Sequence, residues 1–398
     1  MKILQINNVY GEHSTGKLTR QLHLGLLKRG HESLVVYGRG VGGKEQGVRR
    51  LCPDWYGKLN SALRRVTGIP YGGCLLSTWR LQGIIRREKP DVVHLQCING
   101  NFVNIYRLVR WLNKHRIPTV NSLHAEFMYT ANCGHAFDCD RWLTGCGHCP
   151  DAKKATKSLF FDRTAVSFEK MRRAFDGFAT CVNCPVSYWT EDRGRQSPIL
   201  KGMPFQTVFN GVDTEVFHRR EAVAEPTMQV LHVTAGFSDR PGHNKGGFYL
   251  IQLAKRMPDV TFLVAGNVES AEALPENIRL LGVVRDQQIL AAHYRNARVS
   301  VLVSQKETFA MPCAESLCCG TPVVGFKAGG PEQIAMVHYS DFVEYADVDA
   351  LEKQLRRWLT AQPDRQKIAR EAEKIYSVNA MIDGFLEVYK RCDWSRKN

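Results

Sequence analysis

Residues 307–324 read ETFAMPCAESLCCGTPVV. This segment follows an apolar run and leads through a short helical pattern and a Gly-Thr-Pro turn into another apolar run. Glu307 is expected in a loop and Glu315 in the helix. The N-terminus of a helix offers unpaired N–H groups and the positive end of a dipole, which favour a diphosphate. We therefore expect the two carboxylates to bracket a phosphate-containing ligand rather than to be solvated surface charges, because their neighbours are apolar.

Short apolar runs alternate with helical patterns throughout the chain. The first strand, a glycine-containing turn at 11–16, a helical pattern at 18–28 and a second strand form a β-α-β unit. Polar residues follow several apolar runs, and open parallel sheets bind ligands at the carboxyl ends of their strands. The predicted strands are 2–9, 33–37, 90–95 and 118–124, then 230–235, 261–265 and 299–303. The sequence therefore predicts an α/β fold with two doubly wound lobes.

The length of the chain also favours two domains. A single core rarely extends over 398 residues. We place the linker within 205–226, where the alternation is interrupted. The predicted parts are a first lobe at 1–207, a second lobe at 208–374 and an amphipathic C-terminal segment at 375–398.

The sequence around the two glutamates resembles a known family. Glu307 and Glu315, with the Cys-Gly-Thr-Pro-Val-Val that follows, resemble the Glu-x7-Glu signature of family 4 retaining glycosyltransferases. The NGVD at 210–213, the turn at 281–284 and Tyr294 resemble further elements of this family in the same order. The resemblance implies the GT-B fold, with an acceptor-side Rossmann-like lobe, a nucleotide-sugar-binding Rossmann-like lobe and a C-terminal crossover helix that packs back on the first lobe.

The resemblance assigns the donor site mainly to the second lobe. Glu315 would hydrogen-bond the ribose hydroxyls, and Glu307 would contact hydroxyls of the donor sugar. Lys245 would neutralise the diphosphate as it leaves. The backbone that would cradle the sugar and the diphosphate belongs to Phe309, Ala310, Met311 and Pro312.

Three positions of the second lobe depart from the family pattern or complete it. Ala310 stands where many members have glycine, so a slightly different donor placement is expected. Arg240 is the candidate companion of Lys245, although the insertion at 241–244 changes the usual spacing between the two. Val283 lies in the turn that resembles the base-binding turn of the family.

In the first lobe, the resemblance implies two more parts of the site. His124 ends a predicted strand in a segment that resembles the family's Thr-x-His-Asp, whose histidine touches the donor sugar, although Ala125 replaces the aspartate. A histidine at a strand end is otherwise commonly structural. The turn after the first strand resembles the loop over the diphosphate, and its implied contacts are Gly11, Ser14, Thr15 and Gly16.

A cysteine-rich insertion is predicted at 133–149. Its four thiols follow the spacing Cys-x5-Cys-x6-Cys-x2-Cys and could hold a structural zinc or remain free. The insertion resembles one found in colanic-acid and capsule glycosyltransferases of the WcaC kind. The Asp-x-Asp sequences at 138–140 and 347–349 are not expected to bind a catalytic cation, because the second begins a helix, where aspartates cap. The candidate zinc ligands are Cys133, Cys139, Cys146 and Cys149.

The net charge of +15 indicates an anionic partner. We find no nucleic-acid-binding motif, so we expect an anionic inner-membrane surface and not nucleic acid. Basic residues alternate with apolar ones at 58–89, a pattern typical of helices that lie on a membrane or of helices packed on the sheet with solvated arginines. The sequence has no apolar run long enough for a transmembrane helix, so we expect a cytoplasmic protein that associates peripherally with the membrane.

The predicted function is that of a retaining, metal-independent glycosyltransferase. It would transfer a sugar from a UDP- or GDP-sugar to a lipid-linked or oligosaccharide acceptor in the biosynthesis of bacterial surface polysaccharide, such as exopolysaccharide, capsule or lipopolysaccharide. No cofactor is expected for catalysis. The alternatives are a GT-B-like nucleotide-sugar epimerase and a non-catalytic basic scaffold that binds membrane or nucleic acid. The scaffold is disfavoured because it has no need of His124, Lys245, Glu307 and Glu315.

Overall fold

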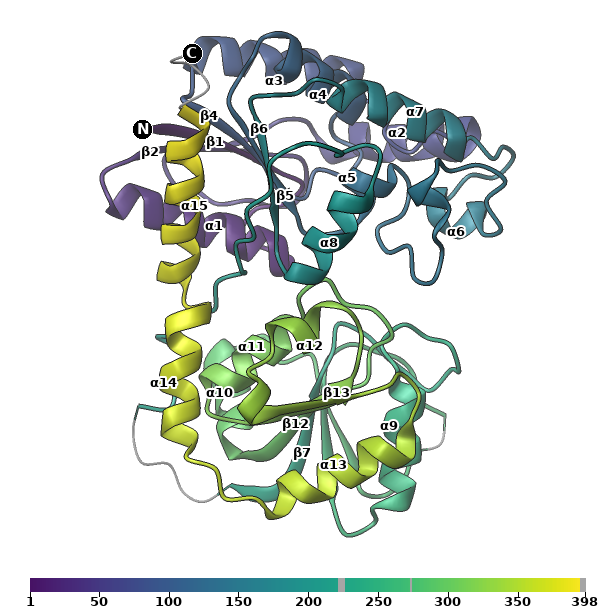
Figure 1. The fold of residues 1–398 in the computed structure, drawn as a ribbon, viewed down its shortest axis with the longest axis vertical. Helices are drawn as coiled ribbons and strands as arrows, with labels where there is room; N and C mark the ends of the chain where they lie inside the picture. Colours follow the sequence, from purple (N-terminus) through teal and green to yellow (C-terminus); the bar gives the residue numbers. More distant parts are fainter. Residues whose placement is uncertain (221–225, 273, 394–398) are drawn as a thin grey trace. The chain divides into compact units, whose positions relative to one another are not determined.

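The computed structural model describes residues 1–220, 226–272 and 274–393. The chain divides into two compact units (Figure 1). The first unit comprises Met1–Phe209 together with the residues from Met381 onward, and the second comprises Asn210–Ala380. We expected the second lobe to begin at residue 208 and to end at residue 374. The contacts within each unit place its start at Asn210 and its end at Ala380, both slightly later.

The described residues of the first unit form a six-stranded parallel sheet in the order β3-β2-β1-β4-β5-β6. Its strands are β1 (Lys2–Asn7), β2 (Glu32–Tyr37), β3 (Val48–Arg50), β4 (Val92–Leu95), β5 (Thr119–Leu123) and β6 (Cys181–Pro185). Valine, isoleucine and leucine make up half of β1 and of β2 and three of the four residues of β4, as expected for strands that are covered on both faces. The chain runs outward from β1 to β3 and then returns to β4, so the strand order reverses between β1 and β4.

Helices flank the first sheet, with α1 and α3 on opposite sides in Figure 1. In α1, Leu18, Leu22 and Leu26 recur every fourth residue and are buried, so one stripe of the helix packs on the sheet. The helices of this part are α1 (His13–Lys28), α2 (Asp54–Thr67), α3 (Leu75–Glu88), α4 (Ile105–Lys114), α5 (Phe127–Thr130), α6 (Ala152–Thr156), α7 (Thr164–Phe175) and α8 (Tyr188–Gln196), with a 3-10 turn at Arg141–Leu143.

The second unit repeats this architecture. Its described residues form a six-stranded parallel sheet in the order β11-β9-β7-β12-β13-β14, with β8 and β10 paired beside it. Here the strand order reverses between β7 and β12. The strands are β7 (Thr227–Val233), β8 (Phe237–Ser238), β9 (Thr261–Ala265), β10 (Val268–Ser270), β11 (Ile278–Gly282), β12 (Ala297–Leu302), β13 (Val323–Phe326) and β14 (Ser340–Val343).

Helices also cover both faces of the second sheet (Figure 1). In α13, Leu351, Leu355 and Leu359 are buried at four-residue spacing against β12 and β13. The helices are α9 (Gly247–Arg256), α10 (Gln287–Asn296), α11 (Met311–Cys318), α12 (Gly330–Ile334), α13 (Val348–Thr360) and α14 (Arg365–Tyr376), with a 3-10 turn at Val337–Tyr339.

The last helix, α15 (Val378–Asp393), packs on the first unit. Tyr389 Oη lies 2.7 Å from His94 Nδ1, at the centre of the first sheet. Gly25 has no side chain, and a Cβ there would collide with Ile382. The C-terminal residues therefore return to the first unit, as the resemblance implied, although the helix breaks at Ser377 rather than continuing from 375.

The structure explains both boundaries. Val208 belongs with the first unit because its N–H donates to the carbonyl oxygen of Pro185 at 3.0 Å, beside the end of β6. Residues up to Ala380 stay with the second unit because Val212 N donates to Tyr376 O and Val378 N donates to Val212 O. These bonds join the beginning and the end of the second unit.

Candidate active site

The reversal of strand order in the second sheet places a crevice between the carboxyl ends of β7 and β12. Where the connections that follow two adjacent strands run to opposite sides of the sheet, a space for a ligand opens between them. The segment after β12 carries Glu307, and the segment after β7 leads to Lys245. These two sequence-predicted residues therefore meet at the switch point.

Lys245 and Glu307 form an ion pair. Lys245 Nζ donates a hydrogen bond to Glu307 Oε1 at 2.6 Å, and the two side chains are 23% and 21% exposed. The pair is thus partly buried and still within reach of a ligand from solvent. Charge-assisted hydrogen bonds of this kind are short and fix both partners in position.

A glycine holds Lys245 at this place. Gly246 has a positive φ of 69°, and a Cβ there would collide with the carbonyl oxygen of Val303 at the end of β12. Another residue would therefore push the turn away from the strand. The N–H of Gln305 also donates to Asn244 O at 2.8 Å, which ties the same turn to the segment that leads to Glu307.

Glu307 is fixed from the other side by the turn after β13. Its N–H donates to Ala328 O at 2.9 Å, and its carbonyl oxygen accepts from Gly330 N at 2.9 Å. Gly330 packs directly on Thr308, where a Cβ would collide with the carbonyl oxygen. Three strand ends, those of β7, β12 and β13, therefore position this carboxylate.

The helix that carries Glu315 begins as predicted, directly after the loop. Ala310 precedes α11 with a positive φ of 67°, a conformation that costs an L-residue about 1–2 kcal/mol and that glycine adopts freely. This backbone geometry accounts for the glycine that many family members have here. Pro312 stands in the first turn, where its missing N–H costs nothing.

Glu315 is held by a buried tyrosine. Tyr294 Oη donates to Glu315 Oε2 at 3.1 Å, and Tyr294 is fully buried. Burial, and then the nearby Glu315 carboxylate, raise the pKa of Tyr294 well above its ordinary value, so the phenol remains a donor. Sequence reasoning noted Tyr294 as a family element but did not pair it with Glu315.

Two predicted residues lie apart from this group. Arg240 is exposed, and no described contact links its guanidinium to the Lys245–Glu307 pair. Val283 is 59% exposed in the turn after β11, at the edge strand of the sheet. Their roles stay predictions.

In the first unit, His124 follows β5 and contacts the end of β4. His124 Nε2 lies 2.7 Å from Gln96 Oε1, and Gln96 Nε2 donates to Gln5 Oε1 at 3.2 Å. Burial lowers the pKa of His124 to about 4, so the imidazole is neutral at pH 7. The Gln96 contact orients the ring; its signal in the sequence is a polar residue directly after a strand, and the sequence interpretation missed it.

The predicted loop after β1 is shorter than expected. The helix α1 begins at His13, so Ser14, Thr15 and Gly16 lie in its first turn rather than in a loop, and the expectation of a helix from residue 18 is corrected. Gly11 has a positive φ of 71°, and its N–H donates to Gly16 O at 2.9 Å. This bond closes the turn and brings the start of the helix to the end of β1.

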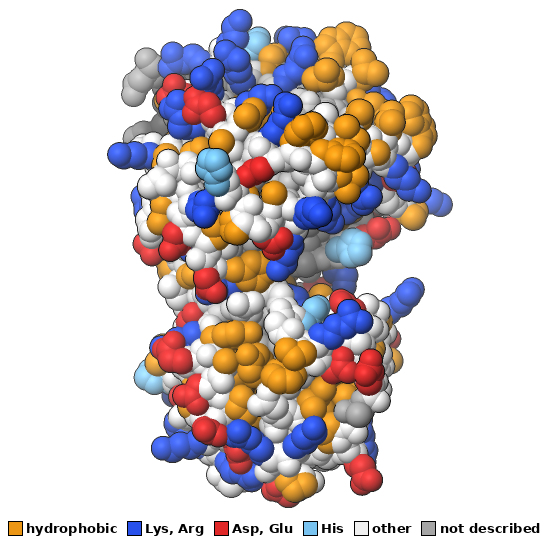
Figure 2. Space-filling model, turned by 90° about the vertical axis from the view of Figure 1, so that its right-hand side faces the viewer, with side chains coloured by type: hydrophobic (Ala, Val, Ile, Leu, Met, Phe, Trp, Pro, Cys, Tyr) orange, Lys and Arg blue, Asp and Glu red, His pale blue; other side chains and the backbone are white. Residues whose placement is uncertain are grey.

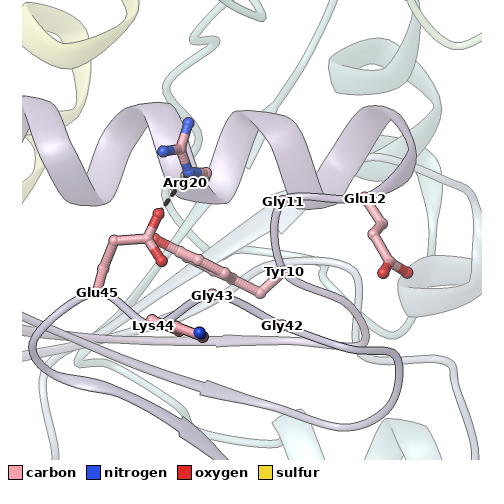
Figure 3. Close-up of a pocket in the computed structure, with 8 residues that line it drawn as sticks. All are labelled: Tyr10, Gly11, Glu12, Arg20, Gly42, Gly43, Lys44 and Glu45. Carbon is pink, nitrogen blue, oxygen red and sulfur yellow. Dashed lines mark hydrogen bonds and ion pairs between the residues drawn. The ribbon is translucent and has the colours of Figure 1, made fainter. Parts of the chain in front are cut away.

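A pocket of about 560 Å³ opens beside this turn, between Tyr10, Gly11 and Glu12 and the residues after β2 (Figure 3). The Arg20 guanidinium donates to Glu45 Oε1 at 2.6 Å across one side of it. Tyr10 is 1% exposed, and its hydroxyl has no hydrogen-bond partner among the described residues. A buried polar group without a partner is costly, so Tyr10 marks a place where a polar ligand atom would be favoured.

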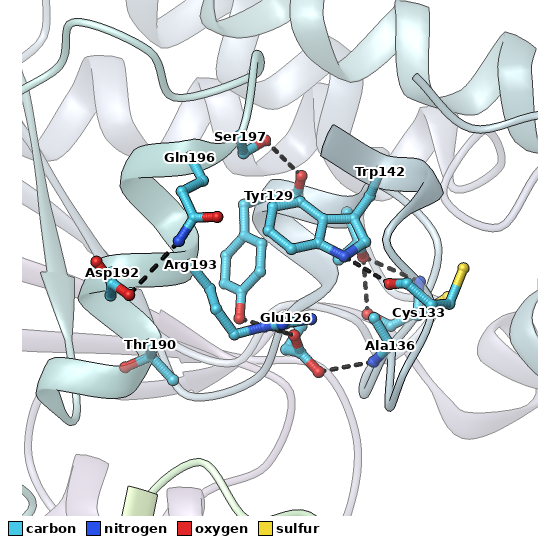
Figure 4. Close-up of polar contacts among 12 residues, drawn as sticks. Glu126, Tyr129, Cys133, Ala136, Trp142, Thr190, Asp192, Arg193, Gln196 and Ser197 are labelled. Atoms are coloured by element: carbon cyan, nitrogen blue, oxygen red, sulfur yellow. Dashed lines mark hydrogen bonds and ion pairs between the residues drawn. The ribbon is translucent and has the colours of Figure 1, made fainter. Parts of the chain in front are cut away.

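The segment after His124 is anchored by a buried ion pair (Figure 4). Glu126 is fully buried and accepts hydrogen bonds from Arg193 Nε at 2.8 Å, Tyr129 Oη at 3.0 Å and Ala136 N at 2.6 Å. The Arg193 guanidinium also lies 4.7 Å from the ring centroid of Trp142. This network joins β5, α8 and the cysteine-rich insertion, and the sequence interpretation did not include it.

The four cysteines of the insertion are free thiols in this structure. Burial, and then the neighbouring Cys146, Cys149 and Cys139, raise the pKa of Cys133 to about 12. Among the residues that the structure describes, no group of three or more His, Cys, Asp and Glu side chains could hold a metal ion. As placed, the thiols therefore do not form a ligand set for zinc.

The second Asp-x-Asp sequence has the predicted structural role. The Asp347 side chain accepts a hydrogen bond from Ala350 N at 2.9 Å and caps α13. This prediction is confirmed. The Asp347 carboxylate is thereby engaged by a backbone N–H at the N-terminus of α13.

Two doubly wound parallel sheets, each with polar residues at the carboxyl ends of its central strands, define a protein of the GT-B type. The chain belongs to Glycosyltransferase Family 4, whose model matches residues 15–216. The model described as glycosyl transferases group 1 matches residues 232–375. The predicted fold and family are confirmed.

Individual relatives agree with this assignment. WcaC, a colanic acid biosynthesis glycosyl transferase of Escherichia coli (strain K12), is 30% identical over 162 residues, 38% of this chain and 40% of WcaC. The GDP-mannose-dependent alpha-(1-6)-phosphatidylinositol dimannoside mannosyltransferase of Mycobacterium tuberculosis (strain ATCC 25177 / H37Ra) is 25% identical over 349 residues, 81% of this chain and 79% of that protein. The chain thus spans less than half of WcaC.

A solved structure shows the same fold. HepE of Anabaena, in complex with UDP, matches with a TM-score of 0.66 at 15% identity, over 98% of this chain and 100% of HepE.

Within the described residues, no helix is long and apolar enough to cross a bilayer.

Proposed function

We propose that this protein is a retaining, metal-independent glycosyltransferase that moves a sugar from a UDP- or GDP-sugar to a lipid-linked or oligosaccharide acceptor of bacterial surface polysaccharide. The observation that carries the donor site is the Lys245–Glu307 pair at the switch point of the second sheet. The nucleotide-sugar donor is supported by HepE, which was solved with UDP. The acceptor class is supported by WcaC and by the mannosyltransferase that is named for a phosphatidylinositol substrate.

In this proposal the protein acts by positioning and by electrostatic stabilisation. Lys245 and the N–H groups at the start of α11 stabilise the charge that develops on the leaving diphosphate. Glu315, oriented by Tyr294, accepts hydrogen bonds from the ribose hydroxyls. The neutral His124 exchanges hydrogen bonds with sugar hydroxyls rather than acting as a proton donor at neutral pH. The turn at Gly11 and the start of α1, with Ser14, Thr15 and Gly16, is the proposed loop over the diphosphate, and the neighbouring pocket lined by Tyr10 is the proposed place of the polar part of the acceptor.

A panel of nucleotide sugars tests this function. We expect release of one nucleoside diphosphate from one member of the panel, faster with a lipid-linked or oligosaccharide acceptor than without it, and a product with the anomeric configuration of the donor. A free, epimerised sugar formed at the same rate without acceptor would instead establish the epimerase. No turnover with any donor would contradict both.

Replacing Glu315 with alanine is expected to weaken donor binding. A lost charge-assisted hydrogen bond costs about 1.5–3 kcal/mol, so the Kd for the nucleotide should rise roughly 10- to 100-fold. Calorimetric titration with the nucleotide identified by the panel measures this. Glu315→Gln keeps an oxygen for Tyr294 and separates the loss of charge from the loss of packing. Unchanged affinity in the folded alanine variant would remove Glu315 from the site.

Activity is expected to survive chelation. In the proposed mechanism the positive charge at the diphosphate comes from Lys245 and from backbone N–H groups, and Asp347 is engaged in capping α13. Initial rates should be equal with EDTA and with added Mg²⁺ or Mn²⁺. If EDTA abolishes turnover of a folded protein and Mn²⁺ restores it, this part of the proposal is wrong.

The structural zinc remains a proposal. It rests on the spacing of the four cysteines and on the closeness of their thiols, since Cys146, Cys149 and Cys139 all raise the pKa of Cys133. Binding would require the sulfur atoms to move to about 2.3 Å from a common ion, with loss of their protons. We expect elemental analysis of protein purified under reducing conditions to find one zinc per chain. A metal-free, fully active preparation would leave free thiols, as the structure has them.

We also propose that the protein is cytoplasmic and associates with the inner face of the membrane through the first unit. Among the apolar residues at 58–89, Leu81, Ile84 and Ile85 are buried in the core of the first unit. They form the inner stripe of α3, as expected for a helix packed on the sheet. Others remain at the surface, namely Leu59, Leu63, Val66, Leu75, Leu76 and Trp79.

A further inference from the structure

Large apolar side chains gather on the surface of α2, α3 and the segment at 159–161. Trp55, Leu76, Trp79 and Phe160 are each between 65% and 72% exposed. Figure 2, which faces the side of α2 and α7, shows hydrophobic side chains grouped in the first unit with Lys and Arg side chains beside them. Monomeric proteins rarely leave so many large apolar groups together in water unless the surface binds something.

The three segments form one continuous surface. Leu159 N donates to Arg65 O at 2.8 Å, so the segment at 159–161 lies against the end of α2. Gly68, which follows α2, approaches the carbonyl oxygen of Phe161 so closely that a Cβ would lie 2.7 Å from it. The exposed aromatic residues of the loop are therefore held beside the exposed face of the helix.

A groove of about 440 Å³ runs between α2 and α3 within this surface. Its walls are mainly apolar and include Leu59 and Leu63 from α2 and Leu75 and Leu76 from α3. Gly72 and Gly73 line it without side chains that would fill it. An apolar groove that opens onto an apolar surface fits a hydrocarbon chain.

Both charged side chains among the described residues that line the groove are cations. They are Arg64, from α2, and Lys170, from α7. Arg64 Nε is buried and has no hydrogen-bond partner in the described part of the chain. A guanidinium that lacks a carboxylate partner matches the oxygens of a phosphate group, and Lys170 adds a second positive charge.

We propose that this groove binds one acyl chain of an anionic phospholipid from the membrane leaflet, with the lipid phosphate held by Arg64 and Lys170. The inference rests on the membrane association proposed above and names the lipid and the residues that recognise it. A leaflet, rather than a single free amphiphile, is the occupant because exposed apolar groups such as Trp79 and Phe160 extend beyond the groove. The exposed Lys58 and Arg65 flank it, where each cation near an anionic surface adds attraction.

Binding of a short-chain lipid to the full-length protein tests the groove itself. Tryptophan fluorescence is titrated with monomeric dioctanoyl phosphatidylglycerol, with dioctanoyl phosphatidylcholine and with glycerol phosphate. We expect phosphatidylglycerol to bind at least about tenfold more tightly than phosphatidylcholine, because the choline cation of phosphatidylcholine neutralises its phosphate and is repelled by Arg64 and Lys170, and we expect glycerol phosphate not to bind at the same concentrations. Equal affinity for the two lipids, or binding of glycerol phosphate as tight as that of the lipid, would overturn the proposal.

Three variants separate the phosphate contact from the chain contact. Arg64→Gln and Leu63→Gln should each lower the affinity for phosphatidylglycerol about tenfold or more. Leu63 is 48% exposed, so its replacement does not open the core. Arg87→Gln is the matched control, since Arg87 pairs with Glu88 and does not line the groove. If folded Arg64→Gln binds as tightly as the natural chain, Arg64 does not recognise the lipid.

Vesicle sedimentation and donor turnover complete the test. Binding to vesicles of phosphatidylcholine with phosphatidylglycerol should exceed binding to phosphatidylcholine alone and should fall with salt, as the Debye length shrinks from about 10 Å at 0.1 M to about 3 Å at 1 M. Hydrolysis of the donor without lipid should be the same in Arg64→Gln and in the natural chain. Lipid binding without any sugar transfer would disprove the proposed function alone, and sugar transfer without lipid binding would disprove this inference alone.

Discussion

Replacing Lys245 with alanine is expected to lower kcat by about 10²–10³-fold while the protein stays folded, the effect typical of losing one group that stabilises developing charge. Lys245 Nζ lies 2.6 Å from Glu307 Oε1 and is partly exposed, so a bound diphosphate would meet a cation that is already in place. Without it, the Glu307 carboxylate would face the diphosphate uncompensated. Initial rates at saturating donor and acceptor measure the change.

The matched control is Lys255→Ala, in the same unit. Lys255 is exposed in the last turn of α9, at the opposite end of that helix from Lys245, so its loss should leave kcat unchanged. A Lys245→Ala variant whose KM rises while kcat stays constant would show that Lys245 contributes equally to ground-state and transition-state binding. A folded variant with natural kcat and KM would contradict the proposed role.

Replacing Glu126 with alanine is expected to destabilise the protein by about 3 kcal/mol, the lower end of the range for breaking a buried ion pair. Glu126 is fully buried, and its loss leaves the Arg193 guanidinium, 16% exposed, without a carboxylate between aromatic rings. Tyr129 Oη and Ala136 N also lose their acceptor. Urea denaturation under reducing conditions, with tryptophan fluorescence as the signal, measures the free energy of unfolding.

Two further variants define the origin of this loss. Glu126→Gln keeps an acceptor and removes the charge, so it should be destabilised less than Glu126→Ala. Glu169→Ala removes an exposed carboxylate that pairs with Arg172 and Arg173 on α7, and it should cause no comparable loss. If the alanine variants at 126 and 169 were equally stable, Glu126 would not anchor the cysteine-rich insertion.

The alternation of apolar runs and helical patterns predicted the inner strands of both sheets, but not the edge strands β3, β6, β11 and β14. The central strands β1 and β7 each carry three valine, leucine or isoleucine residues within six or seven positions, which indicates where they lie. Helix starts were harder. The pattern placed α1 from residue 18, yet it begins at His13, because the tight turn closed by Gly11 and Gly16 starts the helix before its first buried leucine.

The candidate site was predicted as a set of residues and not as a set of contacts. The family motif identified Glu307, Glu315 and Lys245, but the pair between Lys245 and Glu307 joins residues 62 positions apart. It depends on Gly246 packing on the end of β12, which no local pattern encodes. Gln96 and Glu126 were missed for the same reason, since their partners come from other strands and helices.

The membrane prediction shows a different limit. Basic and apolar residues alternate along α3, and its apolar residues form two sets. One set packs on the sheet, and the other is exposed. Leu81 and Ile85 face the sheet, whereas Leu75, Leu76 and Trp79 do not. Composition cannot divide them. The packing of α3 on the first unit separates them, and Leu75 and Leu76 on its exposed side line the groove beside α2.

The return of α15 to the first sheet has a consequence for synthesis of the protein. The ribosome makes residues 1–209 before the second unit, but His94 contacts Tyr389 and Gly25 contacts Ile382 only after residues 210–380 have been translated. The second unit, whose residues are contiguous, can complete its contacts earlier. The first unit therefore completes its contacts only after the second unit has been made, and until then α15 does not cover the surface beside His94 and Gly25.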